Sequence, residues 1–254
     1  MNNSDFFNDE LLEKFIETFY GYGNLQGKYW FIGMEESGGD FKDINNRINI
    51  WNDRKQQEIE DVAQKEIEDV AKYHIALGYG KMFEPRAKLQ PTWNKLIRIV
   101  LSAKGNENIN TEDVRTYQIN ELGRIGKETC LLELLPLPSP SLDHWIYKDH
   151  SRLTYLSDRV HYEKHCLENR INKISEKIKK HQPKAVVFYG KRYEYSWRKI
   201  TKTITDFEFL PTSEGFLTCR NSQTVFVISH HPVAPGLKNE YFHNIGKLIA
   251  TNPA

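Results

Sequence analysis

The sequence predicts an α/β protein, a three-layer α/β/α sandwich around a central, mainly parallel sheet of four strands. Four short apolar runs carry this prediction, because each has the length and composition of a strand buried on both faces. They are KYWFIG (28–33), TCLLELL (129–135), KAVVFYG (184–190) and VFVIS (225–229). Segments with the apolar spacing of helices separate the runs, so we expect one domain over residues 1–254.

The helices are predicted from apolar residues spaced three or four positions apart. A first helix is expected within residues 5–20, whose apolar stripe holds Leu11, Leu12, Phe15, Ile16 and Phe19. A second is expected over 93–101, because Pro91 and Thr92 are typical of a helix start. A long helix over 166–180 and a last one over 241–249 complete the set.

Residues 40–90 are predicted to form a helical insertion after the first strand. The stretch EIEDVAQKEIEDVAK (58–72) contains a near-repeat with an apolar stripe of Ile59, Val62, Ala63, Ile67 and Val70. We expect one amphipathic helix there. Two copies of the repeat are too few for a solenoid.

Composition excludes several classes of protein. Charged residues make up 27% of the chain, and no apolar run approaches the roughly eighteen residues that span a bilayer. The N-terminal MNNSDFFNDE lacks the basic and apolar regions of a signal peptide, so we expect a cytoplasmic protein with no membrane partner. Cys130, Cys166 and Cys219 are too widely spaced for a metal or iron–sulfur site, so no metal and no cofactor are expected. A net charge of +1 neither favours nor excludes nucleic acid.

Each predicted strand runs into an unusual sequence. The four ends read GMEESGG (33–39), PLPSPS (136–141), YGKRY (189–193) and SHHPVAPG (229–236). Proline and polar residues also end strands for structural reasons alone. Because the carboxyl ends of parallel strands meet at one edge, however, these four segments are expected to gather there and to form a site.

The first of these ends carries two glutamates among glycines. A glycine-rich turn after a strand often holds a phosphate, but Glu35 and Glu36 would repel one. Neither of the usual nucleotide-binding patterns, Gly-x-Gly-x-x-Gly or Gly-Lys-Ser/Thr, is present. A carboxylate in this place suits the positioning of water or the stabilisation of a cation.

The segments IGMEESGG and SHHPVAPG together resemble the two motifs of the uracil-DNA glycosylase superfamily. In that family a glycine-rich first motif carries an acidic or amide residue, and the second motif begins His-Pro or Asn-Pro. HQPKAVVFYGKR (181–192) is similar to the segment before the second motif. The resemblance follows the chain in order apart from residues 40–90, and it implies a uracil-DNA glycosylase-like fold. Glu36-Ser37 replaces the usual proline of the first motif, and the four cysteines of the iron–sulfur branches are absent.

The resemblance implies roles for residues of both motifs. Glu35 falls where the family has the residue that handles the water or the sugar cation, with Glu36 as the alternative. His231, before Pro232, matches the histidine that donates a hydrogen bond to the leaving base. His230 would orient that ring or end the strand. The same two motifs add Gly33 and Met34 to the expected substrate contacts.

Glu133 is the candidate for reading the base, because it takes the place of an Asn that often reads uracil in the family. An ionised Glu only accepts hydrogen bonds, which suits the N4 amino group of a cytosine-type base. An internal salt bridge to Arg or Lys is the structural alternative. Phe41 and Tyr189 are expected to stack on the base.

DNA contacts are expected around the same edge. The predicted phosphate contacts are Thr92, Ser139, Ser141, Lys191 and Arg192. Val233 and Leu237 are candidates for the wedge that fills the gap left by a flipped nucleotide, and packing against the sheet would also explain them.

The sequence thus predicts a monomeric DNA base glycosylase that flips out a modified or damaged base and leaves an abasic site, and Glu133 favours a base derived from cytosine. Removal of uracil in base-excision repair is one alternative. A catalytically inactive DNA-binding module of the same fold is another. DNA repair and defence against modified phage DNA are both compatible with these features.

Overall fold

The computed structural model describes residues 5–57, 66–141 and 143–251. Its central strands are the four predicted from the sequence, namely β2 (Tyr29–Gly33), β4 (Thr129–Glu133), β5 (Ala185–Tyr189) and β8 (Val225–Ser229). They pair in parallel in the order β4-β2-β5-β8, and all their residues are buried. The apolar runs are therefore explained by burial on both faces of the sheet.

Additional strands extend the sheet on both sides, so the predicted four-stranded, mainly parallel sheet is wrong. β1 (Gly21–Gly23) pairs antiparallel with β4 and parallel with β3 (Ile67–Glu68). On the other side, β7 (Leu217–Arg220) pairs antiparallel with β8 and with β6 (Leu210–Pro211). Within the described ranges the sheet is mixed and has eight strands in the order β3-β1-β4-β2-β5-β8-β7-β6. The added strands are too short to give a period-2 signal.

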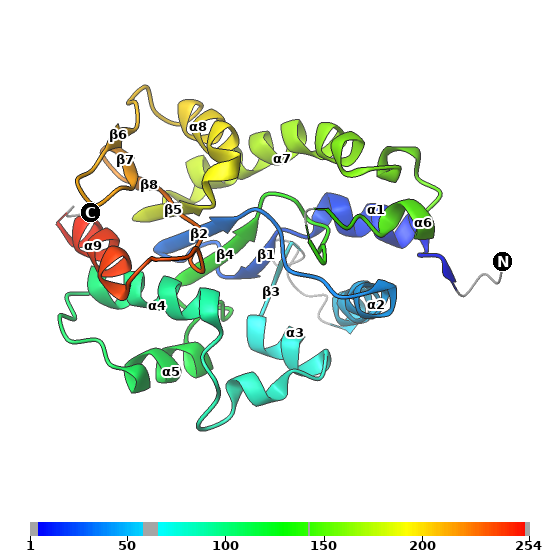
Figure 1. Cartoon of the computed structure of the whole chain (residues 1–254), viewed down its shortest axis with the longest axis horizontal. Coiled ribbons are helices and arrows are strands. Elements are labelled where there is room, and N and C mark those ends of the chain that lie inside the picture. Colours follow the sequence, from blue (N-terminus) through cyan, green and yellow to red (C-terminus); the bar gives the residue numbers. More distant parts are fainter. Residues whose placement is uncertain (1–4, 58–65, 142, 252–254) are drawn as a thin grey trace.

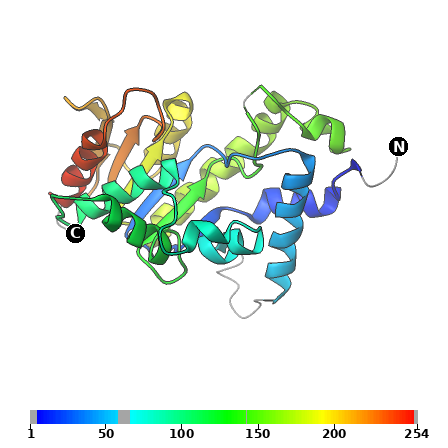
Figure 2. The same cartoon turned by 60° about the horizontal axis from the view of Figure 1, so that its bottom comes forward.

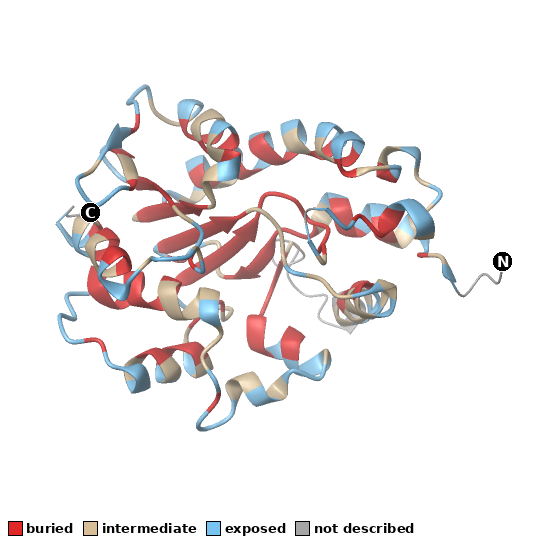
Figure 3. Cartoon of the chain, in the orientation of Figure 1, coloured by how far each residue is buried: buried red, intermediate tan, exposed pale blue. Residues whose placement is uncertain are grey.

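Helices cover both faces of this sheet. Figure 1 shows α7 (Arg159–His181) and α8 (Glu194–Lys202) on one side, and α4 (Pro91–Ala103), α5 (Thr111–Asn120) and α9 (Asn239–Ala250) on the other. Buried residues form the central strands and the helix sides that face them (Figure 3). No helix in the described part of the chain is long and apolar enough to cross a membrane.

The predicted helices within 5–20, 93–101, 166–180 and 241–249 are confirmed as α1 (Asp9–Thr18), α4, α7 and α9, with shifted ends. Local capping fixes these ends. The side chain of Asn8 accepts a hydrogen bond from the backbone N–H of Leu11, and that of Asp158 accepts one from His161. Gln182, with a φ of 47°, closes α7 in the left-handed conformation.

The segment 40–90 differs from its prediction. An unexpected helix, α2 (Phe41–Gln57), packs against α1, and Figure 2 shows the two helices crossing. The predicted helix over 58–72 is wrong where it can be compared, because residues 67–68 join the sheet as β3. A new helix, α3 (Val70–Ala76), then begins after Asp69, whose side chain caps it. Residues 58–65 lie outside the described ranges.

The contact between α4 and α9 depends on Gly246. A Cβ atom at this position would overlap the carbonyl oxygen of Ile99 and the Cβ of Ser102, and would lie 3.0 Å from the backbone nitrogen of Ala103. The missing side chain thus lets the backbone of α9 rest directly on α4.

We predict that Gly246→Ala destabilises the fold by about 1–3 kcal/mol, the usual cost of overpacking a core. Alanine normally stabilises a helix interior by about 1 kcal/mol over glycine, so steric overlap must reverse the sign. Urea unfolding would measure the difference. Lys247→Ala, on the exposed side of the same helix, serves as the control and should change the free energy of unfolding by less than about 0.5 kcal/mol.

Candidate functional site

The parallel strands end together at one edge of the sheet, where the register places Gly33 beside Glu133 and Tyr189 beside Ser229. In the sheet, β4 lies on one side of β2, whereas β5 and then β8 lie on the other side. Connections therefore leave the ends of β2 and β5 in opposite directions, which opens a crevice at that point. A cleft of about 520 Å³ lies at this edge.

Most of the predicted site residues line this cleft. They are Met34, Glu35, Glu36, Thr92, Glu133, Ser139, Ser141, Tyr189, His231 and Val233. These residues come from the ends of all four central strands and from the start of α4. The expected gathering of strand ends is therefore present in the structure.

The other predicted residues lie elsewhere. Phe41 stacks on His150 with ring centroids 4.4 Å apart and lines a separate depression, so it is not placed to stack on a base in the cleft. Leu237 packs against the hydrophobic core. His230 lies beside Tyr241. The backbone N–H of His230 donates a hydrogen bond to the hydroxyl of Tyr241 at 3.1 Å.

The two predicted phosphate contacts of the third strand end also lie outside the cleft lining. Lys191 and Arg192 belong to the short helix η5 (Lys191–Tyr193) that follows β5. The ammonium group of Lys191 donates a hydrogen bond to the backbone carbonyl of Gly215 at 3.3 Å, whereas Arg192 is exposed. Arg192 is therefore the freer of the two cations.

Glu35 is held in a buried ion pair. Both of its carboxylate oxygens accept hydrogen bonds from the guanidinium of Arg159, each at 2.8 Å, and the two side chains are only 5% and 9% exposed. Burial raises the pKa of Glu35, although Arg159 opposes that effect. With both oxygens bound to one cation, Glu35 is poorly suited to activate water.

Glu36 faces the cleft with fewer constraints. The hydroxyl of Tyr22 donates to Oε1 of Glu36 at 2.7 Å. Its nearest cation is Arg47, whose Nη1 lies 3.8 Å from Oε2 and which binds Asp43 at 2.9 Å. Glu36 is thus the better placed of the two glutamates to act on a molecule in the cleft.

Glu133 is a buried carboxyl with an unusual protonation state. Burial raises its pKa well above the ordinary value, and the charges of Glu36 and Glu35 raise it further. Its Oε2 atom is buried without a hydrogen-bond partner. Arg170 and a hydrogen bond with Tyr189 oppose this shift, but burial outweighs them, so the folded structure favours the protonated form of Glu133 over the ionised carboxylate expected from the sequence.

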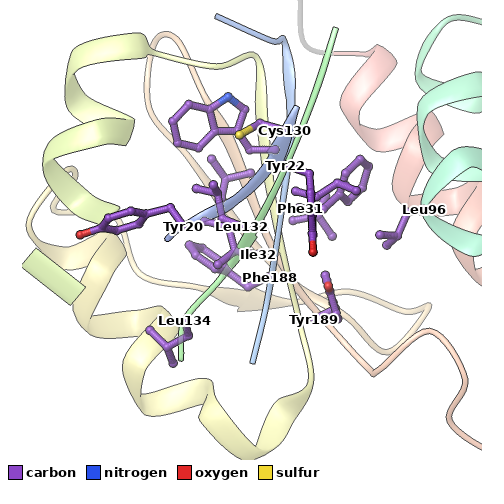
Figure 4. Close-up of a cluster of buried hydrophobic side chains, with 14 of the residues drawn as sticks. Tyr20, Tyr22, Phe31, Ile32, Leu96, Cys130, Leu132, Leu134, Phe188 and Tyr189 are labelled. Carbon is purple, nitrogen blue, oxygen red and sulfur yellow. The ribbon is translucent and has the colours of Figure 1, made fainter. Parts of the chain in front are cut away.

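Gly33 makes room for this acid. A Cβ atom at residue 33 would overlap the hydroxyl of Tyr189 and would lie 2.7 Å from Oε2 of Glu133. A larger residue at position 33 would therefore have to displace the ends of these two side chains. Figure 4 shows Tyr22 and Tyr189 on the side of the sheet that faces Leu96 of α4, with Tyr20 and Leu134 on the other side.

Arg170 of α7 fixes the backbone at the end of β4. Its buried guanidinium donates to the carbonyl oxygens of Glu133 at 2.6 Å, Leu134 at 3.1 Å and Phe19 at 2.9 Å, and it lies over the ring of Tyr20. The charge is thereby compensated by backbone dipoles. These bonds hold the backbone from which the side chain of Glu133 reaches the cleft.

His231 presents a hydrogen-bond donor. Its Nδ1 atom accepts a hydrogen bond from the backbone N–H of Val233 at 3.4 Å, so the proton of the neutral ring is on Nε2. The residue is exposed, yet its protein neighbours remove enough water to lower the pKa of the imidazole. Its ring meets that of Tyr189 edge to face, with centroids 5.8 Å apart.

Several residues of the cleft wall were missed by the sequence reasoning. They are Ser37, Arg47, His74, Tyr79, Met82, Gln90, Trp93 and Pro140. Most belong to the segment 40–90 or to the first turn of α4. The sequence does contain a signal for this wall of the cleft. The stretch YHIALGYGKMF (73–83) groups several aromatic residues with a histidine.

Comparison with known proteins does not identify the chain. No model of a protein family matches the sequence, and no curated protein matches it. In the described part of the chain, no group of three or more His, Cys, Asp and Glu residues is placed to hold a metal ion. The resemblance to the uracil-DNA glycosylase superfamily therefore rests on the sequence motifs alone.

The neutral state of Glu133 gives a testable pH dependence. Above the unfolded pKa of about 4.3, the unfolded chain releases this proton while the folded chain retains it. Native stability should therefore fall by about 1.4 kcal/mol per pH unit, relative to Glu133→Gln, until the raised folded pKa is reached.

Urea unfolding of both proteins from about pH 3 to about pH 8 would measure this difference. At the acid end of this range the free energies of unfolding of the two proteins should change with pH in the same way, because residue 133 is then uncharged in both chains. If the difference in free energy of unfolding between the two proteins stays constant over the whole pH range, Glu133 ionises normally in the folded protein.

Proposed function

We propose that this chain is a DNA base glycosylase acting on a modified or damaged pyrimidine. The observation that carries the proposal is the convergence of a carboxylate (Glu36), a neutral acid (Glu133) and a histidine donor (His231) on one cleft at the carboxyl edge of the sheet. The two motifs that suggested this superfamily supply Glu36 and His231. The fold alone would not support such an assignment, because similar sheets serve many functions.

The reaction breaks the bond between C1′ of the sugar and a nitrogen of the base. The bonding electron pair leaves with the base, positive charge develops on the sugar, and water adds to C1′ and loses a proton. Glu36 would stabilise the sugar cation and take up that proton. Its hydrogen bond from Tyr22 fixes one oxygen, and the other oxygen, which lies 3.8 Å from Nη1 of Arg47, would take this role.

His231 would act on the departing base. Negative charge develops on a carbonyl oxygen of the base as the bond breaks, and the N–H at Nε2 of His231 would donate to it. A neutral imidazole suits this role because it does not need to lose a proton before the next cycle. The neighbouring Pro232 is buried and anchors the turn.

Glu133 would read the edge of the base. As a neutral acid it donates through O–H and accepts through C=O, whereas an ionised carboxylate only accepts. It therefore complements O4 and N3–H of uracil as well as N3 and the N4 amino group of cytosine. The preference for a cytosine-derived base loses its electrostatic basis, and uracil is a second candidate substrate on this observation.

The proposal is tested with duplexes that contain uracil, a thymine mismatch or modified cytosines, followed by alkaline cleavage of abasic sites. Glu36→Gln and His231→Ala should each lower base release by roughly 10²-fold or more, the scale of losing one well-placed charge or donor. DNA binding and unfolding should change little, because both side chains face the cleft.

His230→Ala is the matched control, since His230 is the neighbouring residue and lies outside the cleft lining. If no duplex yields abasic sites but the native protein still binds DNA, the chain is the inactive DNA-binding module instead. Near-native base release by both cleft variants would remove Glu36 and His231 from the mechanism.

The two wedge candidates differ in position, which gives a matched pair of variants. Val233 is 50% exposed and lines the cleft, whereas Leu237 packs against the core. We predict that Val233→Ala lowers activity more on paired DNA than on single strands, because only the duplex must be held open. Leu237→Ala should instead lower stability and leave the ratio of the two activities unchanged. Equal losses on both substrates for Val233→Ala would contradict a wedge role.

A further inference from the structure

One wall of the cleft contains a buried histidine that the proposed mechanism does not use. His74 lies on α3, is only 8% exposed and lines the cleft. Its ring contacts those of Tyr22 and Trp93, each with centroids 5.4 Å apart, and that of Phe83 at 6.3 Å. The ring therefore forms part of an aromatic wall.

The hydrogen bonding of His74 fixes its tautomer. Nδ1 lies 2.7 Å from the carbonyl oxygen of Val70, which can only accept, so Nδ1 carries the proton. In the neutral ring Nε2 then holds a lone pair. Burial, with a smaller contribution from Arg47, lowers the pKa of His74 against the opposing effect of Glu36. The second ring nitrogen is thus a hydrogen-bond acceptor.

The segment that carries this wall is held firmly. Asp69 caps α3 and also binds Arg124 and the backbone N–H of Ile125, each at 3.1 Å. The buried side chain of Gln118 donates to the carbonyl oxygens of Met82 at 3.0 Å and Lys88 at 3.1 Å. The acceptor is consequently preorganised, as a specific binding site requires.

The charges around the wall disfavour an anionic ligand group. Arg47 lies between Glu36 and Asp43, so its positive charge is already compensated. An anionic group would meet Glu36 and a lone pair on His74. The total volume of about 520 Å³ is in the range that holds a whole drug-sized molecule, so a base can enter together with a substituent.

We propose that His74, together with Trp93, forms a subsite that recognises a hydrogen-bond donor, such as a hydroxyl, carried by the base. This inference rests on the proposed function, because it deepens the description of the same cleft. His74 is a specificity residue in this proposal and takes no part in breaking the glycosidic bond. Aromatic packing holds the substituent, and Nε2 accepts its hydrogen bond.

The test uses DNA duplexes that carry a 5-hydroxymethyl or a 5-methyl pyrimidine, on a uracil or on a cytosine ring. A fluorine at the 2′ carbon of the same nucleotide destabilises the sugar cation and prevents cleavage, so binding is measured apart from catalysis. Of the two hydroxymethyl duplexes, we take the one that the native protein binds more tightly. It should bind roughly three- to tenfold more tightly than the methyl duplex with the same ring, which is the effect of one neutral hydrogen bond.

Two variants of His74 distinguish a loss of recognition of the substituent from a loss of the folded structure. His74→Gln retains an acceptor at the far end of the side chain and should keep the preference. His74→Asn retains a donor near Val70 but removes the far acceptor, so both duplexes should bind with equal affinity. Circular dichroism and urea unfolding would establish that the two variants remain folded.

The outcomes for the subsite and for the proposed function are distinct. A preference that depends on His74 without any base release from cleavable duplexes would support the subsite and reject the glycosylase proposal. Base release without a difference between the hydroxymethyl and methyl duplexes would support the glycosylase and overturn the subsite. Loss of the preference in His74→Gln as well as in His74→Asn would also overturn it.

Discussion

The buried carboxyl of Glu133 sets requirements that the surrounding structure must meet. Transfer of an unpaired carboxylate from water into the protein interior costs far more free energy than transfer of the neutral acid, so folding retains the proton. Gly33 provides the space for this acid beside Tyr189. Arg170 binds the backbone carbonyl of Glu133 and holds this part of the chain in place. The backbone oxygens that it binds compensate the charge of Arg170.

The cleft combines two neutral histidines with opposite hydrogen-bonding faces. A backbone N–H donates to Nδ1 of His231 and leaves a proton on Nε2, whereas a backbone carbonyl binds Nδ1 of His74 and leaves a lone pair. With a neutral acid and aromatic rings nearby, such a site distinguishes ligands by the direction of their hydrogen bonds.

The centre of the fold was predictable because burial on both faces leaves continuous apolar runs in β2, β4, β5 and β8. The edge strands were not predictable, since they contain too few residues to show a period. The strand ends also indicated where the cleft lies. Sequence alone could not show that Glu35 pairs with Arg159, because the two residues are 124 positions apart. The neutral state of Glu133 and the position of Phe41 away from the cleft likewise depend on tertiary packing.

The helix α7 links three distant parts of the chain through cations on its inner side. Arg159 binds Glu35, Arg170 binds the end of β4, and Lys177 binds Glu66 just before β3. Since a helix turns once in about 3.6 residues, Arg159 and Arg170 are separated by about three turns and project in the same direction. A single inserted residue between them would rotate one cation by about 100° relative to the other. The length of this helix is thus as tightly constrained as the identity of the residues that it carries, and insertions in related chains should be confined to its two ends.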